Sequence, residues 1–220
     1  MRFNCNLFVL KASGDSVNAG LNLSEQSHGH HHRFPDKLAF LLNNPLRRRL
    51  LPPERLISKL GIDSNDVVVD FGCGPGFITI PLAKVAGKAI GVDVSPRMLE
   101  RADRYAKRRQ VSVELLQSDG TDLELTDKSI DLILLNHVFH EIENKRGTLS
   151  EFLRVLKPSG RVAIIEKTSG GGILSGRFGP PIINEEEVTR ELKAAGFDSL
   201  QAIPYGKDSV ILGQKAAPGS

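Results

Sequence analysis

Short apolar runs alternate with helix-like segments over most of the chain, and this alternation constrains the fold more than any other feature. The first run, residues 67–71, contains three consecutive valines, which favour a buried strand. Strands that alternate with helices predict βαβ units, in which the helical crossovers let the strands run parallel. The predicted strands cover residues 67–71, 88–92, 111–116, 130–135 and 161–166, and the predicted helices cover residues 52–60, 77–85, 96–108, 145–156 and 184–195.

The end of the chain departs from this rhythm. Residues 200–203 and 209–212 are predicted to be two more strands, and the five residues between them leave no room for a helix. Such spacing predicts an antiparallel hairpin. We therefore expect an α/β fold with a doubly wound, mostly parallel seven-stranded sheet that carries an antiparallel strand at its edge. Residues 36–220 should form this single domain, preceded by a loose extension or lid over residues 1–35.

Composition excludes several classes of protein. With 220 residues, of which 40% are hydrophobic and 25% charged, the chain has a globular rather than a disordered composition. No apolar stretch approaches the roughly 18–20 residues that a membrane span needs. The cysteines, Cys5 and Cys73, are too few for a disulfide scaffold or a multi-cysteine metal site, and a reducing, cytoplasmic setting is expected.

The positive charges do not indicate nucleic acid as the main partner. The net charge is only +3, tryptophan is absent, and aromatic residues make up 5% of the chain, whereas single-stranded nucleic acid is usually bound by stacking aromatics. The basic runs at residues 47–49 and 107–109 are interpreted as solvated faces or ends of helices. A transition metal could bind His28 and the histidines at 30–32, but the favoured interpretation is a flexible segment that binds metal adventitiously, and no resident metal is predicted.

A glycine-rich turn follows the first predicted strand. Gly72, Gly74 and Gly76 permit a left-handed backbone and the close approach of a ligand, and N–H groups at the start of the next helix can face an anionic group. Asp93 ends the second strand, where an acid can accept hydrogen bonds from both hydroxyls of a ribose. This order of elements indicates a ligand that contains a nucleoside. The alternatives are glycines that only pack helix on strand and an ordinary surface aspartate.

Two further observations reduce the range of nucleoside ligands that the sequence indicates. Phe77 stands where the dinucleotide fingerprint has its third glycine, and the glycines are not followed by the Lys-Ser or Lys-Thr of a P-loop. Asp119 and Gly120 follow the third predicted strand, where a carboxylate can accept a hydrogen bond from an adenine amino group. These features disfavour a dinucleotide and a nucleoside triphosphate.

With Asp70, the three glycines, Asp93 and Asp119, the sequence resembles the class I S-adenosylmethionine-dependent methyltransferases. The resemblance extends in element order over residues 46–215, and its most specific stretch is residues 67–83. Within that family the chain is most similar to the small-molecule branch that includes the quinone-biosynthesis C-methyltransferases, on the strength of residues 135–141 and 153–160.

The resemblance implies S-adenosyl-L-methionine as the cofactor and assigns a part of it to each strand end. Val94 and Met98 would flank the adenine, although ordinary helix packing is an equally open role for both. The other implied contacts are Gly72, Gly74 and Gly76 along the methionine part with Asp70 near its ammonium, Asp93 on the ribose, Asp119 and the Gly120 amide on the adenine edge, and Asn136 beside the sulfonium.

Methyl transfer from a sulfonium needs a general base only if the acceptor arrives protonated. His137, His140 and Glu141 follow the fourth predicted strand and are the candidates. The alternative is that His140 and Glu141 bond to each other and steady the loop. Because the Asn-Pro-Pro-Tyr or Asp-Pro-Pro-Tyr motif of amino-methylating nucleic-acid enzymes is missing after that strand, we expect a small-molecule acceptor methylated on oxygen, nitrogen or carbon.

Two other functions stay open at the level of the sequence. A nicotinamide-dependent oxidoreductase would share the glycine turn and the acid, but Phe77 disfavours it. An RNA-binding or non-catalytic adenosyl-binding module would use the basic residues 47–49.

Overall fold

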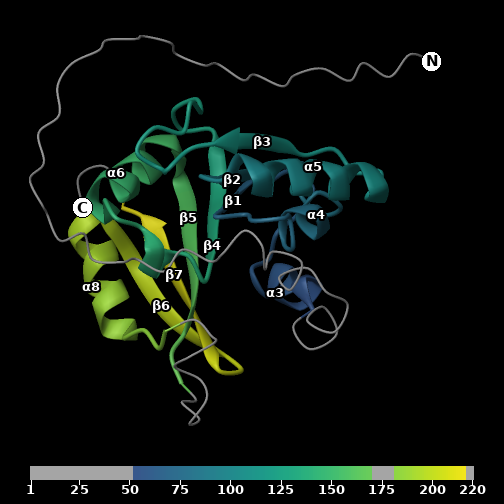
Figure 1. Ribbon diagram of the computed structural model, residues 1–220. Helices are drawn as coiled ribbons and strands as arrows, with labels where there is room; N and C mark the ends of the chain where they lie inside the picture. The colour runs from purple at the N-terminus through teal and green to yellow at the C-terminus, as the bar shows by residue number, and fades with distance from the viewer. Residues whose placement is uncertain (1–51, 170–180, 217–220) are drawn as a thin grey trace, which may run out of the picture. The chain divides into compact units, whose positions relative to one another are not determined.

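The computed structural model describes residues 52–169 and 181–216 (Figure 1). The predicted extension at residues 1–35, its histidines and the basic run at 47–49 lie outside the described residues.

A seven-stranded sheet forms the centre of the described structure, in the order β3-β2-β1-β4-β5-β7-β6 (Figure 1). β7 pairs antiparallel with both of its neighbours, and the other pairs are parallel. The predicted α/β class, the mostly parallel sheet and the antiparallel hairpin are therefore confirmed. The strands are β1 (Val67–Phe71), β2 (Lys88–Asp93), β3 (Glu114–Gln117), β4 (Ile130–Asn136), β5 (Leu156–Lys167), β6 (Phe197–Tyr205) and β7 (Asp208–Lys215).

The two strands of the hairpin do not follow chain order across the sheet. β7 is inserted between β5 and β6, and the edge is formed by β6. Val210 and Ile211 of β7 are fully buried, whereas Gln201 and Ala202 of β6 are exposed. The more apolar strand of the hairpin takes the inner position because both of its faces are covered there.

Helices cover both faces of the sheet (Figure 1). One buried cluster joins apolar residues of the strands to α6 and α8, and a second cluster joins the opposite face to α3 and α4. α5 lies on the side of α4, where its Ala102 approaches Gly76. The helices are α3 (Pro53–Lys59), α4 (Thr79–Leu82), α5 (Pro96–Arg109), α6 (Lys145–Val155) and α8 (Glu185–Ala195), with a short 3-10 helix η2 (Phe139–Glu141).

Several element boundaries differ from the prediction, among them those of α4, β5 and β3. α4 has four residues instead of the predicted nine, because Pro81 has no N–H to donate to the carbonyl of Phe77 and the flanking residues form single turns. β5 starts at Leu156, which pairs with Ile130 directly after α6 ends. β3 is displaced toward its C-terminal end, at Glu114–Gln117.

Phe152 of α6 is central to the packing on its face of the sheet. Its side chain is fully buried, and its ring meets that of Phe71 edge-on with the centroids 5.1 Å apart. The aromatic pair thus joins α6 to the end of β1, where the glycine turn begins.

We expect Phe152→Ala to lower the free energy of unfolding by about 3–5 kcal/mol, because it removes a buried ring and leaves a cavity. Val85→Ala, at a side chain that is 42% exposed, is the control and should change it by less than about 0.5 kcal/mol. Denaturant titration of both variants measures the difference, and a loss below about 1 kcal/mol for Phe152→Ala would contradict this account of the core.

Candidate functional site

The strand order reverses between β1 and β4, so the C-terminal ends of these two strands meet at the switch point of the sheet. Ligands of open α/β sheets bind beyond the carboxyl ends of the strands at such a point. Asp70 lies near the end of β1 and the glycine turn follows this strand, while Asn136 ends β4 and is followed by His137 and η2. The topology therefore gathers most of the predicted site residues at one edge.

The glycine turn is fastened to β2 by its own backbone. The N–H groups of Gly72 and Cys73 both donate to the carbonyl oxygen of Val92, at 2.8 and 2.9 Å, and the N–H of Gly76 donates to Cys73 at 3.0 Å. The N–H of Gly74 donates to the Asp93 carboxylate at 2.8 Å. These four N–H groups therefore already donate within the protein.

Gly72 and Gly74 differ in what surrounds them. All three glycines of the turn have positive φ, and an added Cβ on Gly72 would lie 2.4 Å from Cγ2 of Val138. A Cβ on Gly74 would meet nothing within 4 Å. Gly72 is required for packing between the two strand ends, whereas Gly74 borders open space that a ligand can enter.

Asp93 connects the glycine turn to the start of α5. One carboxylate oxygen accepts from Gly74 and the other accepts from the N–H of Ser95 at 2.9 Å. Ser95 in turn caps α5 by accepting from the N–H of Met98 at 3.4 Å. The carboxylate of Asp93 thus joins the glycine turn to the N-terminus of α5.

The two apolar residues beside Asp93 differ in exposure. Val94 is 44% exposed, while Met98 is only 5% exposed and packs inside. Val94 thus presents an apolar surface to solvent, whereas Met98 packs in the interior.

Asp70 points into the protein on the α4 side of the sheet. Its side chain is 2% exposed and accepts a hydrogen bond from the Thr79 hydroxyl at 2.5 Å. Burial raises the pKa of Asp70 to about 6, against the lowering effect of the hydrogen bonds from Thr79. Its charge therefore depends on pH close to neutrality.

Asp119 and Gly120 form a tight turn after β3. Asp119 accepts from both the N–H and the hydroxyl of Thr121, at 2.9 and 2.7 Å, and these bonds hold the pKa of the exposed carboxylate below its usual range. Gly120 is buried with φ +93°, and an added Cβ would lie 2.6 Å from the Phe71 ring. Its N–H donates to the Ser118 hydroxyl at 3.0 Å.

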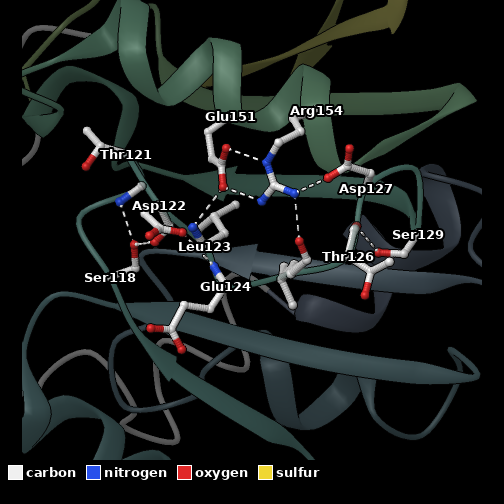
Figure 2. A network of polar contacts seen from close by, with 12 residues as sticks. Ser118, Thr121, Asp122, Leu123, Glu124, Thr126, Asp127, Ser129, Glu151 and Arg154 are labelled. Carbon is white, nitrogen blue, oxygen red and sulfur yellow. Dashed lines mark hydrogen bonds and ion pairs between the residues drawn. The ribbon is translucent and has the colours of Figure 1, made fainter. Parts of the chain in front are cut away.

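Figure 2 shows how α6 holds the connection between β3 and β4. Glu151 accepts from the N–H of Leu123 at 2.9 Å and from the Arg154 guanidinium at 2.6 and 2.8 Å. Arg154 also donates to the carbonyl of Leu125 at 2.8 Å and pairs with Asp127. The hydrogen bonds from Arg154 keep the pKa of Glu151 below its usual range, so the pair stays charged and anchors the loop that begins with Asp119.

The predicted base candidates lie beside two carboxylates that sequence reasoning missed. Nδ1 of His140 lies 2.9 Å from Oε2 of Glu166, at the end of β5, and Nε2 of His137 lies 3.4 Å from Oδ2 of Asp208, on β7. The closest ring nitrogen of His140 is 3.9 Å from Glu141, beyond hydrogen-bond range, so the anticipated pair of these two is corrected. An isolated Glu166 after a run of apolar strand residues was the available signal.

The part of the chain that the structure describes was searched for metal-binding clusters and for membrane-spanning helices, and neither is found there. No group of three or more histidine, cysteine, aspartate or glutamate residues is arranged there to hold a metal ion. None of the helices described is long and apolar enough to cross a membrane.

Comparison with known proteins finds methyltransferases that resemble the chain. Residues 69–164 match the model of a methyltransferase domain. The demethylmenaquinone methyltransferase of Lactobacillus johnsonii is 34% identical over 118 residues, which cover 51% of this chain and 48% of that protein. The ubiquinone biosynthesis O-methyltransferase of Rickettsia felis is 31% identical over 125 residues, which cover 55% of this chain and 49% of that protein.

A similar solved structure agrees with these matches. The crystal structure of an S-adenosylmethionine-dependent methyltransferase from Aquifex aeolicus has a TM-score of 0.76 and 27% sequence identity, and the match covers 84% of this chain and 100% of that one. The chain spans about half the length of the curated relatives it matches. With the strand order, the glycine turn and the acid after β2 in place, the chain is similar in both sequence and fold to S-adenosylmethionine-dependent methyltransferases.

Proposed function

We propose that this protein binds S-adenosylmethionine at the carboxyl edge of β1, β2 and β4 and methylates a small hydroxylated aromatic molecule of the quinone-precursor kind. The observation that carries the proposal is the Asp93 carboxylate, held at 2.8 Å by the N–H of Gly74 beside open space. A ribose hydroxyl pair needs a carboxylate at the end of β2, and Asp93 has that position.

The residues present fit the cofactor. Gly74 leaves room for the methionine part, and the exposed face of Val94 suits a flat adenine ring. Asp70 would act on the ammonium from behind the turn, since its carboxylate is buried. The remaining proposed contacts are Gly72, Gly76 and Met98, which shape the walls, Asp119 with Gly120 at the adenine edge, and Asn136 beside the sulfonium.

The chemistry of the bound cofactor is a methyl group on a sulfonium, which departs from a neutral thioether. The protein therefore has to position the acceptor, exclude water and remove a proton where the acceptor carries one. In this proposal Asn136 at the end of β4 positions the acceptor, and His137, His140 and Glu141, which follow it, are the candidates for proton removal.

Two observations support a quinone-precursor acceptor. The names of the matched relatives specify demethylmenaquinone and ubiquinone biosynthesis. Imidazoles paired with carboxylates at the end of β4 suit an acceptor with an acidic hydroxyl. The nicotinamide alternative is disfavoured because the Phe77 side chain is 7% exposed and belongs to the packed core, where a dinucleotide-binding turn has glycine.

We expect Asp93→Ala to weaken S-adenosylmethionine binding by about 1–3 kcal/mol, because ribose hydroxyls lose their acceptor. Calorimetric titration measures the dissociation constant. Asp103→Ala is the matched control, since Asp103 pairs with Lys107 on α5, and its affinity should stay within about twofold of wild type. Wild-type affinity in Asp93→Ala would contradict the ribose assignment.

Alanine at Gly74 and at Gly72 should have different consequences. The added Cβ of Gly74→Ala meets no protein atom within 4 Å, but the left-handed backbone adds strain of about 1–2 kcal/mol. Because this Cβ would occupy space proposed for the cofactor, we expect the affinity to fall while the protein still folds. Gly72→Ala adds a clash with Val138 to the same strain and should lower the unfolding free energy further. Thermal unfolding and calorimetry on both variants separate the two effects; equal stability losses would show that the Val138 contact is unimportant.

The acceptor class is tested by incubating wild-type protein with labelled S-adenosylmethionine and a panel of quinols, catechols, amines and RNA. We expect label in the quinols or catechols, and mass spectrometry of the product distinguishes methylation on oxygen from methylation on carbon. Binding of NAD in place of S-adenosylmethionine, or label confined to amines or RNA, would count against the proposal.

A further inference from the structure

α5 concentrates the positive charge of the chain. Its 14 residues include six arginines and lysines but only two acids, which gives the helix a net charge of +4. The whole chain has a net charge of only +3, so the remainder is slightly acidic on balance. Positive charge gathered on one element of a nearly neutral chain is the electrostatic pattern of a surface that meets a polyanion.

Four arginines form a stripe along one face of α5. Successive members of the stripe are four, three and four residues apart, so they lie above one another on the helix. Ala102 and Ala106 lie on the opposite side, where the helix packs on β2 and β3 (Figure 1). The arginine stripe consists of Arg97, Arg101, Arg104 and Arg108. At the rise of an α-helix it is about 16 Å long.

Ion pairs leave most of the stripe's charge in place. Arg104 lies 3.9 Å from Glu100, but the two side chains are 58% and 61% exposed, and such a surface pair is weak. The other acid of the helix, Asp103, pairs at 2.7 Å with Lys107, which is outside the stripe. Arg97 and Arg108 are exposed, and no ion pair is found for either of them among the residues that the structure describes.

The remaining basic residues of α5 have structural roles. Lys107 and Arg109 belong to the last turn, where cations interact favourably with the helix dipole. The Arg109 guanidinium also lies over the Tyr105 ring, 5.3 Å from its centroid. These roles do not account for the stripe, because two of its members, Arg97 and Arg101, lie in the first half of the helix.

We propose that the arginine stripe docks this protein on a membrane surface rich in anionic phospholipid, with α5 parallel to that surface. A guanidinium can bind a phosphate through two parallel hydrogen bonds, and a straight row of them meets a plane along its whole length. The apolar side of α5 is packed on the sheet, so the attachment is electrostatic and reversible.

Nucleic acid offers the same phosphates but fits this surface less well. Proteins that bind single strands add aromatic side chains on which the bases stack. Tyr105 is the aromatic residue of α5, and it is half-buried with Arg109 over its ring. A helix that reads a duplex enters a groove, whereas α5 lies along β2 and β3.

Co-sedimentation with lipid vesicles tests the proposal. We expect the wild-type protein to bind vesicles of phosphatidylglycerol and phosphatidylcholine in equal amounts, and to be released as salt is raised. Vesicles of phosphatidylcholine alone should not bind it. In Arg104→Gln/Arg108→Gln the partition coefficient should fall about 25-fold, since each basic residue near an anionic surface contributes about fivefold.

Arg190→Gln/Lys193→Gln on α8 is the matched control, because it also removes two positive charges from exposed side chains. Its partition coefficient should stay within about twofold of wild type. Glutamine is a good helix former, so the stripe variant should fold, which circular dichroism and thermal unfolding verify. If it does not fold, Arg108→Gln alone serves, with an expected loss of about fivefold.

Three outcomes would overturn the proposal. Equal losses in the stripe variant and the α8 control would show that net charge, and not the stripe, determines binding. Wild-type protein that binds phosphatidylcholine alone as strongly as the anionic vesicles would exclude an electrostatic attachment. Binding of single- or double-stranded RNA through the stripe, without binding of anionic vesicles, would identify nucleic acid as the partner instead.

Discussion

The attachment of the glycine turn to β2 is the constraint on which the site depends. The carbonyl of Val92 receives two N–H groups of the turn, and the carboxylate of Asp93 receives the next one. These bonds fix a backbone that runs through positive φ at Gly72 and Gly74. In the proposed site the same carboxylate shapes the turn and accepts from the ribose, so the geometry of the turn and the proposed recognition of the nucleoside depend on one residue.

Two buried carboxylates sit at strand ends in a sheet that is otherwise filled with aliphatic side chains. Asp70 lies near the end of β1, on the face of the sheet that α4 covers. Glu166 lies near the end of β5, on the opposite face of the sheet, beside η2. Each is satisfied by one neighbour from the adjoining segment, Thr79 for Asp70 and His140 for Glu166. Such buried polar contacts are stabilising only when complete, and they link the two loops of the switch point to rigid strands.

The sequence predicts the features that depend on local spacing. The alternation of strands and helices, the glycine turn and the acid after β2 are each set by residues close together in the chain, and the fold they indicate is confirmed. The predicted length of α4 was wrong because Pro81 interrupts the hydrogen bonds of the helix, although this proline was visible in the sequence. The sequence spacing did not predict the inner position of β7, because the pairing order depends on how much apolar surface each strand buries. In the site, the occupied N–H groups of the turn and the Glu166–His140 pair were not predictable, since both depend on three-dimensional proximity between separate strands.

The same distinction explains why the proposed cofactor half of the site is easier to predict from the sequence than the proposed acceptor half. The proposed cofactor half is built by β1, β2 and the start of α5, which follow one another directly, so its residues keep a recognisable spacing. The proposed acceptor half draws on β4, β5 and β7, and its side chains come from residues as far apart as His137 and Asp208. Pairs that meet across that distance can change partner without disturbing the strand order, because only their mutual charge and hydrogen bonding have to match. A fold of this kind can therefore keep its cofactor while it changes its acceptor, and the chemistry that distinguishes this protein has to be sought at the ends of β4 and β5.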